Sequence, residues 1–226
     1  MELPRLQYIT HPLENFDDLS WVHRLADNGV KWIQLRIKEE DVMKHFPDRH
    51  YRAYFHEIAD RMRTVTEALG MKMTINDAAD VAVFSHADGL HIGQEDDLSE
   101  VNTNIFGKSL ILGGTANSIS EINHFIGVPL TYFGIGPFKQ TTTKQTAKPV
   151  LGIDGYKELI HYLKETERPI PVFAIGGIEY TDVAPLLEAG VYGVAISGAL
   201  FHSGHDPEAI RSFTKALEAY EFTTGK

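Results

Sequence analysis

The sequence predicts an α/β fold, a (β/α)8 barrel of the TIM-barrel type, in a single domain over residues 1–226. Three observations support this. Short apolar runs recur eight times, amphipathic stretches at helical spacing lie between them, and several of these stretches end at a glycine, as helices often do. Strands that alternate with helices build a parallel sheet covered by its crossover helices, and eight such units close a barrel. Because barrels of this kind usually have about 250 residues, we expect mostly short loops.

The expected strands follow one another through the whole chain. They are Leu6–Thr10, Trp32–Ile37, Lys72–Ile75, Gly89–Ile92, Leu110–Gly113, Thr131–Gly134, Val172–Ile175 and Gly193–Ile196. Helices are expected at Leu19–Asn28, Tyr51–Leu69, Ser118–Ile126 and Asp182–Ala189. A doubly wound open sheet is the alternative, although no G-x-G-x-x-G motif follows the first strand. The charged insertion after the second strand, Glu39–Arg52, is either a mobile lid or a longer loop.

Composition excludes several classes of function. The net charge is −10, with 21 basic and 31 acidic residues, which argues against a nucleic-acid or membrane-surface partner but allows a small anionic substrate. The chain has no cysteine, so disulfides, zinc thiolates and cysteine nucleophiles are ruled out. The first residues do not form a signal peptide, and no apolar run is long enough to span a membrane. We therefore expect a cytoplasmic protein.

Polar residues alternate with apolar ones along the second strand. Gln34, Arg36 and Lys38 share one face, and isoleucine and leucine occupy the other. In a closed barrel the apolar face packs against the helices, so the three polar side chains would point inward, towards the mouth. Burying two cations there costs several kcal/mol unless anions offset their charge. The alternative, a strand with one solvated face, fails if the barrel is closed.

Two carboxylates follow neighbouring strands. Asp77 ends the third strand and Asp96 follows the fourth, which would place both on the rim that carries the cations. Mg²⁺ commonly takes one or two protein carboxylates together with phosphate oxygens and water. Asp77 could instead cap a helix that begins at Ala78, and Asp96 could belong to an acidic turn with Glu95 and Asp97. Together with the cations, the pair indicates a polyphosphate ligand.

Three further strand ends carry groups that suit an anion. The run Gly136–Lys144 joins a turn to three hydroxyls and an ammonium group, although such a run alone is more often a polar surface loop. Gly176–Gly177 and Ser197–Gly198 follow the seventh and eighth strands, where barrels of this kind often bind phosphate. The alternative for both is a pair of tight turns. None of the eleven histidines is given a catalytic role.

These pieces lie in the order found in the thiamine-phosphate synthase family, which the sequence resembles over nearly its whole length, from Tyr8 to Ser197. The matching blocks are Gln34–Lys38, Ile75–Asp77, Ala87–Asp96, Gly136–Pro137 with Thr141–Lys144, and Ala174–Ile178. The resemblance implies a transferase that joins hydroxymethylpyrimidine diphosphate to thiazole phosphate, giving thiamine phosphate and diphosphate. The diphosphate would leave first, the pyrimidine ring would stabilise the resulting cation, and the thiazole nitrogen would then attack.

The resemblance also implies roles for individual residues. The pyrimidine diphosphate would be held by Gln34, Arg36, Lys38, Asn76, Thr115 and Lys144, of which Arg36, Lys38, Thr115 and Lys144 would be catalytic. Asp77 and Asp96 would hold Mg²⁺. The thiazole phosphate would be held by Thr141, Thr143, Gly177, Ile196 and Ser197. Thr115 stands where the family usually has serine, and its hydroxyl keeps a contact to the pyrimidine or its leaving group plausible.

The chain departs from the family pattern at two places. His11 stands where the family commonly has aspartate, and the segment after Lys38 diverges, so neither is assigned by resemblance. The oligomeric state is open, and a homo-oligomer is compatible with the sequence. Whether the second substrate is the ordinary or the carboxylated thiazole phosphate is also open.

Two other functions remain as alternatives. Thiazole tautomerases of the same superfamily tend to lose the metal aspartates and the diphosphate cations, and to place a histidine in the loop after strand six. This chain keeps those groups, and Gly136–Phe138 contains no histidine. The other alternative is a non-catalytic barrel that binds a phosphate ligand, and the paired aspartates give it little support.

Substituting the assigned groups tests this interpretation. Lys144→Ala and Asp96→Ala should each slow turnover by orders of magnitude without unfolding the protein, because each removes charge stabilisation from the leaving group. The measurement is the rate of diphosphate release, with circular dichroism as the check on folding. Near-normal rates would remove the assignments.

Overall fold

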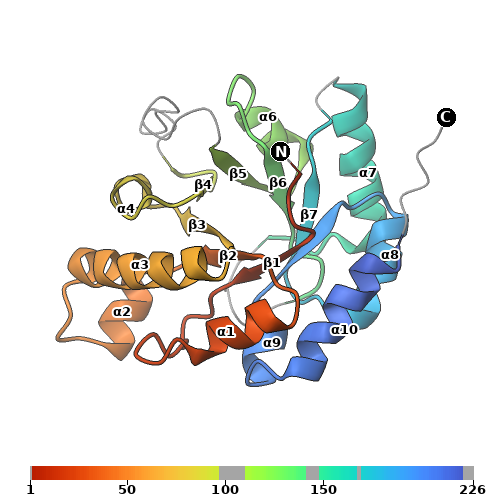
Figure 1. Ribbon diagram of the computed structural model, residues 1–226. Coiled ribbons are helices and arrows are strands. Elements are labelled where there is room, and N and C mark those ends of the chain that lie inside the picture. Colours follow the sequence, from red (N-terminus) through yellow and green to blue (C-terminus); the bar gives the residue numbers. More distant parts are fainter. Residues whose placement is uncertain (1, 97–109, 141–147, 167–168, 221–226) are drawn as a thin grey trace.

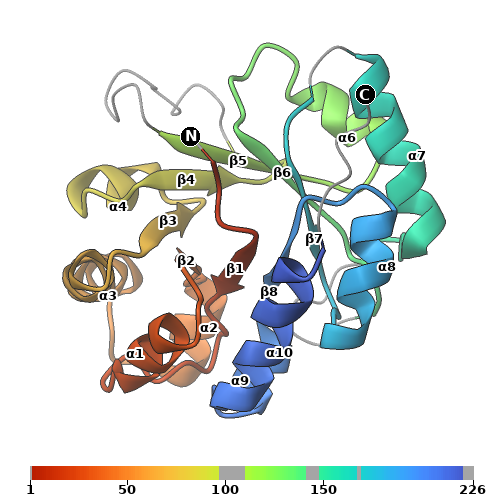
Figure 2. The same cartoon turned by 45° about the vertical axis from the view of Figure 1, so that its right-hand side comes forward.

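Eight parallel strands close into a barrel in the computed structural model, which describes residues 2–96, 110–140, 148–166 and 169–220. Each strand pairs with its neighbours in sequence, and the last pairs with the first, with Leu6 opposite Val194 and Tyr8 opposite Ile196. Figures 1 and 2 show the helices arranged around the strands. The predicted (β/α)8 barrel is confirmed, and the open sheet is wrong because its edges would not pair.

The strands lie within a few residues of their predicted positions. They are β1 Leu6–Ile9, β2 Trp32–Leu35, β3 Lys72–Asn76, β4 Gly89–Ile92, β5 Ile111–Ala116, β6 Tyr132–Ile135, β7 Val172–Ile175 and β8 Gly193–Ile196. Two differences affect the site. Strand β2 ends before Arg36, so Arg36 and Lys38 belong to the loop that follows it, whereas β5 continues far enough to include Thr115.

The helices fill the spaces between successive strands. They are α1 Ser20–Asp27, α2 Glu39–His45, α3 Tyr51–Ala68, α4 Ala79–Phe84, α6 Ile119–His124, α7 Gly152–Glu165, α8 Val183–Glu188, α9 Gly198–His202 and α10 Pro207–Glu218, with a 3₁₀ turn at Tyr180–Asp182. The charged insertion contains helix α2, whose first turn carries three acidic residues that suit the positive end of the helix dipole. Among the described helices, none combines the length and the apolar character needed to cross a membrane.

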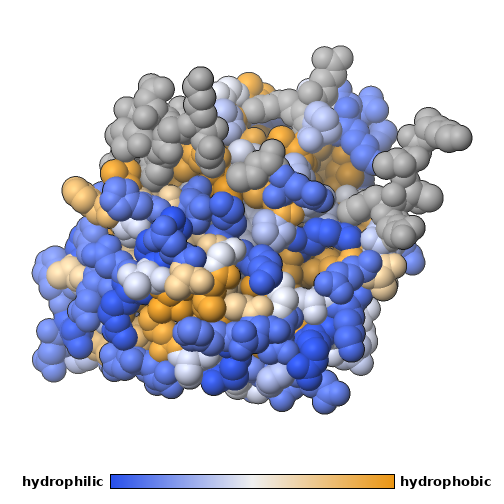
Figure 3. Space-filling model, viewed as in Figure 1, coloured by the Kyte–Doolittle hydropathy of each residue, from blue (hydrophilic) through white to orange (hydrophobic). Residues whose placement is uncertain are grey.

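Apolar side chains form two layers. The larger one lies between the strands and the helices and includes Phe55 and Leu25. The smaller one fills the inside of the barrel, where Trp32, Tyr132 and Phe173 meet edge to face with ring centroids 4.9–5.4 Å apart. The helices present mainly hydrophilic residues outward in the view of Figure 3. The aromatic layer forms a floor, so any cavity in the barrel lies above it.

A buried polar cluster connects the loop after β1 to the segment between α9 and α10. The Tyr8 hydroxyl donates to Glu14 Oε2 at 2.5 Å and lies 2.8 Å from His205 Nε2. Burial, reinforced by the charge of Glu14, raises the pKa of Tyr8, so the phenol keeps its proton and can donate. The His205 ring stacks on Trp21 at 5.2 Å. The cluster thereby holds the end of α9 against the barrel.

Removing the carboxylate of this cluster should destabilise the fold. Glu14→Ala removes the carboxylate that accepts from the buried Tyr8 hydroxyl and that lies beside His205, and should lower the free energy of unfolding by about 1–3 kcal/mol. Urea unfolding followed by fluorescence measures the change. Glu218→Ala, at an exposed position, is the matched control and should change it little. Equal midpoints for the two variants would contradict the role given to the cluster.

Candidate active site

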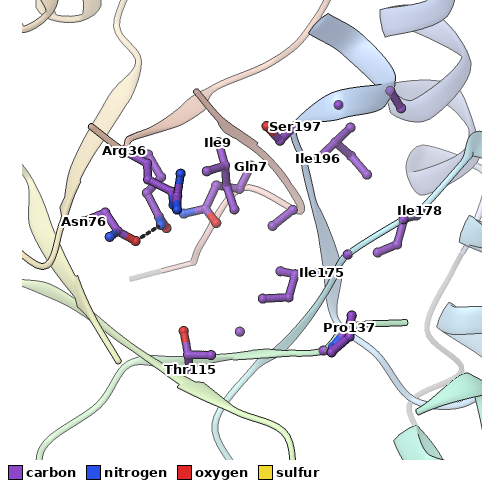
Figure 4. A pocket seen from close by; sticks show the side chains of 18 of the residues that line it. Gln7, Ile9, Arg36, Asn76, Thr115, Pro137, Ile175, Ile178, Ile196 and Ser197 are labelled. Atoms are coloured by element: carbon purple, nitrogen blue, oxygen red, sulfur yellow. Dashed lines mark hydrogen bonds between the residues drawn. The ribbon is translucent and has the colours of Figure 1, made fainter. Parts of the chain in front are cut away.

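A cavity of about 440 Å³ opens at the carboxyl ends of the strands. Figure 4 shows Arg36 and Asn76 across the cavity from Pro137 and Ile178. The predicted substrate-binding residues that line it are Gln34, Arg36, Asn76, Thr115, Gly177, Ile196 and Ser197. They come from five different strands or the loops after them, so the barrel brings together residues that are far apart in sequence.

Arg36, which lines this cavity, has one guanidinium nitrogen without a hydrogen bond to any described residue. Its Nη1 atom is buried and has no hydrogen-bond partner among the residues that the structure describes. The nearest carboxylate oxygen, Asp41 Oδ2, lies 3.8 Å away, too far for a hydrogen bond. Thr10 fixes the backbone here, since its hydroxyl accepts from Arg36 N at 2.9 Å and donates to Arg36 O at 3.1 Å. A buried guanidinium of this kind suits an anionic ligand.

Ser197 presents a second unpartnered group. Its hydroxyl is buried at the end of β8, lines the cavity, and has no hydrogen-bond partner within the described parts of the chain. Ser197 and Arg36, both in the predicted site, therefore line the same cavity. Two polar groups left open on different walls of one cavity indicate that the cavity takes ligands with polar atoms at both places.

Lys38 and the two aspartates form a charged group beside the cavity. Lys38 is the one described member of the predicted substrate-binding set that does not line the cavity; its ammonium pairs with Asp77 instead. The N-cap reading of Asp77 is wrong, because α4 is capped at Ala78 without any side-chain hydrogen bond and Asp77 itself has a positive φ of 64°. Asp96 accepts a hydrogen bond from Gly93 N at 2.6 Å, as a turn residue would.

The electrostatics of this group suit a cation shared with a ligand. Burial is the main cause that raises the pKa of Asp96, and neighbouring Asp77 raises it further, against the Gly93 N–H and Lys38, which lower it. The described residues contain no group of three or more candidate ligands that would hold a metal by themselves. Two adjacent carboxylates nevertheless fit Mg²⁺ when phosphate oxygens and water complete its shell.

The last part of the Gly136–Lys144 run lies outside the described residues, and with it Thr141, Thr143 and Lys144. The described flanks on either side, Pro137 and Lys148 among them, line the cavity. The run therefore begins at the cavity, and Lys148, four residues beyond its end, also lines it.

A hydrogen-bonded bracket that sequence reasoning missed holds these flanks. The Asn117 side chain donates to Gly136 O at 2.9 Å and to Pro149 O at 3.0 Å. Glu121 accepts from Asn117 N at 2.7 Å and pairs with Lys148 Nζ at 2.6 Å. The segment after β5, with the start of α6, thus fixes the chain on both sides of residues 141–147. Only the fold brings these residues together.

The loop after β7 packs closely against the loop after β6. Gly177 has a φ of +67°, and a Cβ atom there would lie 2.7 Å from Gln140 O. Lys139 N donates to Gly176 O at 3.0 Å. Position 177 therefore requires glycine, both for its backbone conformation and because a side chain would not fit. Gly177 forms a tight turn and also lines the cavity.

His91 was also missed by sequence reasoning. It lies on β4, lines the cavity, and its two ring nitrogens lie 2.8 Å from Tyr132 Oη and 2.7 Å from Thr115 Oγ1. Beside it, Gln34 Nε2 donates to Asn76 Oδ1 at 2.8 Å, the dashed line in Figure 4. Alternation along β4, which puts the side chain of His91 inside a closed barrel, was the signal that could have identified it.

His11, the departure from the family pattern, has a packing role. Its ring stacks on Phe201 of α9 with centroids 3.9 Å apart, and its Nδ1 accepts from Leu13 N at 3.2 Å. Burial and the nearby His202 lower the pKa of His11. A neutral ring stacked on an aromatic neighbour fixes α9 beside the cavity.

A closed parallel barrel whose carboxyl-end cavity carries open anion-binding groups and an adjacent carboxylate pair defines an enzyme-like site for phosphorylated small molecules. A family model described as thiamine monophosphate synthase matches residues 6–200. The chain belongs to that family.

Individual relatives agree with this. A thiamine-phosphate synthase of Flavobacterium johnsoniae is 33% identical over 95% of this chain and 97% of its own length. One of Phocaeicola vulgatus is 34% identical over 90% of this chain and 93% of its own. The solved thiamine phosphate pyrophosphorylase from Pyrococcus furiosus superposes with a TM-score of 0.75 at 26% identity, covering 95% of this chain and 96% of that one.

The open hydroxyl at the end of β8 gives a binding prediction. Ser197→Ala should weaken the binding of inorganic phosphate by about 10–100-fold, as expected for one lost hydrogen bond to an anion. Isothermal titration calorimetry measures the affinity. Ser120→Ala, on the exposed face of α6, is the matched control. If both variants bind phosphate as the wild type does, Ser197 does not face the anion.

Proposed function

We propose that the protein condenses hydroxymethylpyrimidine diphosphate with thiazole phosphate to give thiamine phosphate and diphosphate. Family membership supports this reaction, and one structural observation carries its application to this chain. Two buried polar groups, Arg36 Nη1 and Ser197 Oγ, stand open in one cavity, and they lie at the positions where the family resemblance puts the two phosphorylated substrates. A cavity of about 440 Å³ is within the usual range for small-molecule sites.

The pyrimidine diphosphate would bind on the side of β2 and β3. Arg36 would donate to its phosphate oxygens through the guanidinium nitrogen that has no hydrogen bond to a described residue. Lys38 would also contact these oxygens, either by leaving Asp77 or while still paired with it. The Gln34–Asn76 pair would contact the pyrimidine end. Lys144, from the run after β6, would supply another positive charge to the leaving group.

Asp77 and Asp96 would hold Mg²⁺, which supplies further neutralisation of the diphosphate charge. The raised pKa of Asp96 supports this, because burial and, after it, the neighbouring carboxylate disfavour its charged form until a cation offsets the charge.

The thiazole phosphate would bind on the side of β7 and β8. Ser197 would donate its hydroxyl to the phosphate, and backbone at Gly177 and Ile196 would line the same wall. Thr141 and Thr143 would add hydroxyl donors from the run after β6.

The proposed chemistry needs positioning more than it needs a protein nucleophile. The bond between the pyrimidinylmethyl carbon and the diphosphate oxygen breaks, and its electrons leave with the diphosphate. The pyrimidine ring delocalises the positive charge, and the thiazole nitrogen lone pair then forms the new carbon–nitrogen bond. Arg36, Lys38 and Lys144 stabilise the departing charge, and the shared cavity aligns the two substrates.

We propose the cytoplasm as the location, since a chain without cysteine suits a reducing compartment.

The proposal predicts diphosphate release only when both substrates and Mg²⁺ are present. Omitting either substrate, or adding EDTA, should abolish release, and excess Mg²⁺ should restore it. Asp77→Asn should slow release by about a hundredfold or more, because it removes half of the carboxylate pair. Asp60→Asn, at an exposed position on α3, is the matched control.

The same assay separates the alternatives. Isomerisation of a thiazole phosphate without diphosphate release would identify a tautomerase. Binding of both phosphorylated compounds without any turnover would identify a ligand-binding barrel. Either result would overturn the proposed reaction.

A further inference from the structure

We infer that His91 is a positioning residue that fixes the hydrogen of the Thr115 hydroxyl, so that Thr115 donates a hydrogen bond into the cavity. The inference deepens the proposed function and rests on it for the identity of the ligand. His91 itself would act through Thr115, with which it shares a hydrogen bond of 2.7 Å.

The barrel interior makes room for this arrangement. The exposed fraction of His91 is 5%, and Tyr132 is fully buried. A Cβ atom on Gly113 would lie 2.4 Å from His91 Nδ1 and 2.2 Å from Tyr132 Cζ, and one on Gly134 would lie 3.2 Å from His91 Cε1. Two strands therefore carry glycine at the inward positions where any larger residue would displace the imidazole or the phenol.

The protonation of Tyr132 determines which atoms donate and which accept in the hydrogen bonds that join Tyr132, His91 and Thr115. Burial raises the pKa of Tyr132, so its hydroxyl keeps a proton to donate. The described groups that could accept from it include His91 Nδ1 at 2.8 Å and Gln34 Oε1 at 3.5 Å; the Thr74 hydroxyl also faces it but forms no direct hydrogen bond with it. The second distance is too long for a hydroxyl donor, whose bonds to oxygen span about 2.5–3.0 Å. Tyr132 therefore donates to His91 Nδ1.

A nitrogen that accepts a hydrogen bond carries no proton, so the neutral imidazole of His91 is protonated at Nε2. That Nε2–H group donates to Thr115 Oγ1 at 2.7 Å. The hydroxyl hydrogen of Thr115 must then point away from His91. Thr115 lines the cavity, as Figure 4 shows, so this hydrogen is available to a ligand there.

The chemical consequence concerns the substrate atom that faces Thr115. An acceptor there, either an oxygen of the diphosphate or a ring nitrogen, receives the Thr115 hydrogen. If His91 were protonated at Nδ1 instead, Thr115 would donate to His91 and could face the ligand only as an acceptor. The tautomer of His91 thus decides whether Thr115 can donate a hydrogen bond to the substrate.

The tautomer can be measured in the resting enzyme by NMR. The ¹⁵N chemical shifts of the imidazole nitrogens distinguish a protonated from an unprotonated atom, and the signals of His91 are those lost in His91→Gln. We expect a protonated Nε2 and an unprotonated Nδ1 in the wild type. A protonated Nδ1 would overturn the inference, whatever the enzymatic activity.

Kinetics provide the second test, as a double-mutant cycle. Thr115→Val should lower kcat/KM for the pyrimidine diphosphate by about 10–100-fold, as expected for a lost hydrogen bond to a charged ligand. Tyr132→Phe should lower it by a smaller factor alone, and by almost none when Thr115→Val is already present, because the phenol acts through Thr115. The same factor in both backgrounds would contradict the inference.

Matched variants separate a positioning role from a loss of stability. Tyr156→Phe removes another buried phenol, whose hydroxyl donates to Ile135 O at 2.5 Å outside this network. Any effect it has should be the same with and without Thr115→Val. Thr115→Ser, which keeps the hydroxyl, should retain more activity than Thr115→Val. If Tyr132→Phe fails to fold, the NMR measurement on the wild type still decides.

The two proposals fail in different ways. Absence of diphosphate release by the wild-type enzyme would sink the proposed reaction and leave the tautomer measurement intact. An active wild type with the wrong tautomer, or with an additive cycle, would sink the role of His91 alone.

Discussion

The pairing of β1 with β8 is the constraint on which the rest of the structure depends. Once the sheet is closed, the inner faces of all eight parallel strands share one small space. Aromatic rings fill the lower part of this space and leave a cavity above them. A polar side chain that points inward has no access to water except through the mouth of the barrel. It must bond to another inward group or to a ligand.

Inward polar groups divide accordingly into two sets. Gln34 bonds to Asn76, and His91 bonds to Tyr132, so these groups are held in place before any ligand arrives. The guanidinium of Arg36 keeps an open position. Groups of the first set give the cavity its shape and fix the direction of its hydrogen bonds, whereas the open groups gain their partners from the ligand. Such preorganisation lets charge stabilisation act without rearrangement of the protein.

The sequence predicted all eight strands, because each is a short apolar run bounded by glycine or polar residues. Arg36 lines the cavity as alternation predicted, although the strand ends before it, whereas Lys38, expected on the same face, pairs with Asp77 instead. The sequence was less informative where the folded structure overrides a local pattern. A helix cap was one alternative for Asp77, but its backbone adopts a positive φ and the helix begins without it. Asn117 was missed because its partners, Gly136 and Pro149, become neighbours only in the folded barrel. His91 was overlooked although its inward position followed from the predicted strand.

The aromatic floor formed by Trp32, Tyr132 and Phe173 has a consequence for traffic through the barrel. It blocks the interior below the cavity, so molecules enter and leave by the carboxyl-end face. Two molecules that occupy such a blind chamber together cannot exchange independently. Both have to pass through the same mouth. The size of that mouth, and not only the contacts inside the cavity, therefore limits how fast ligands can be exchanged.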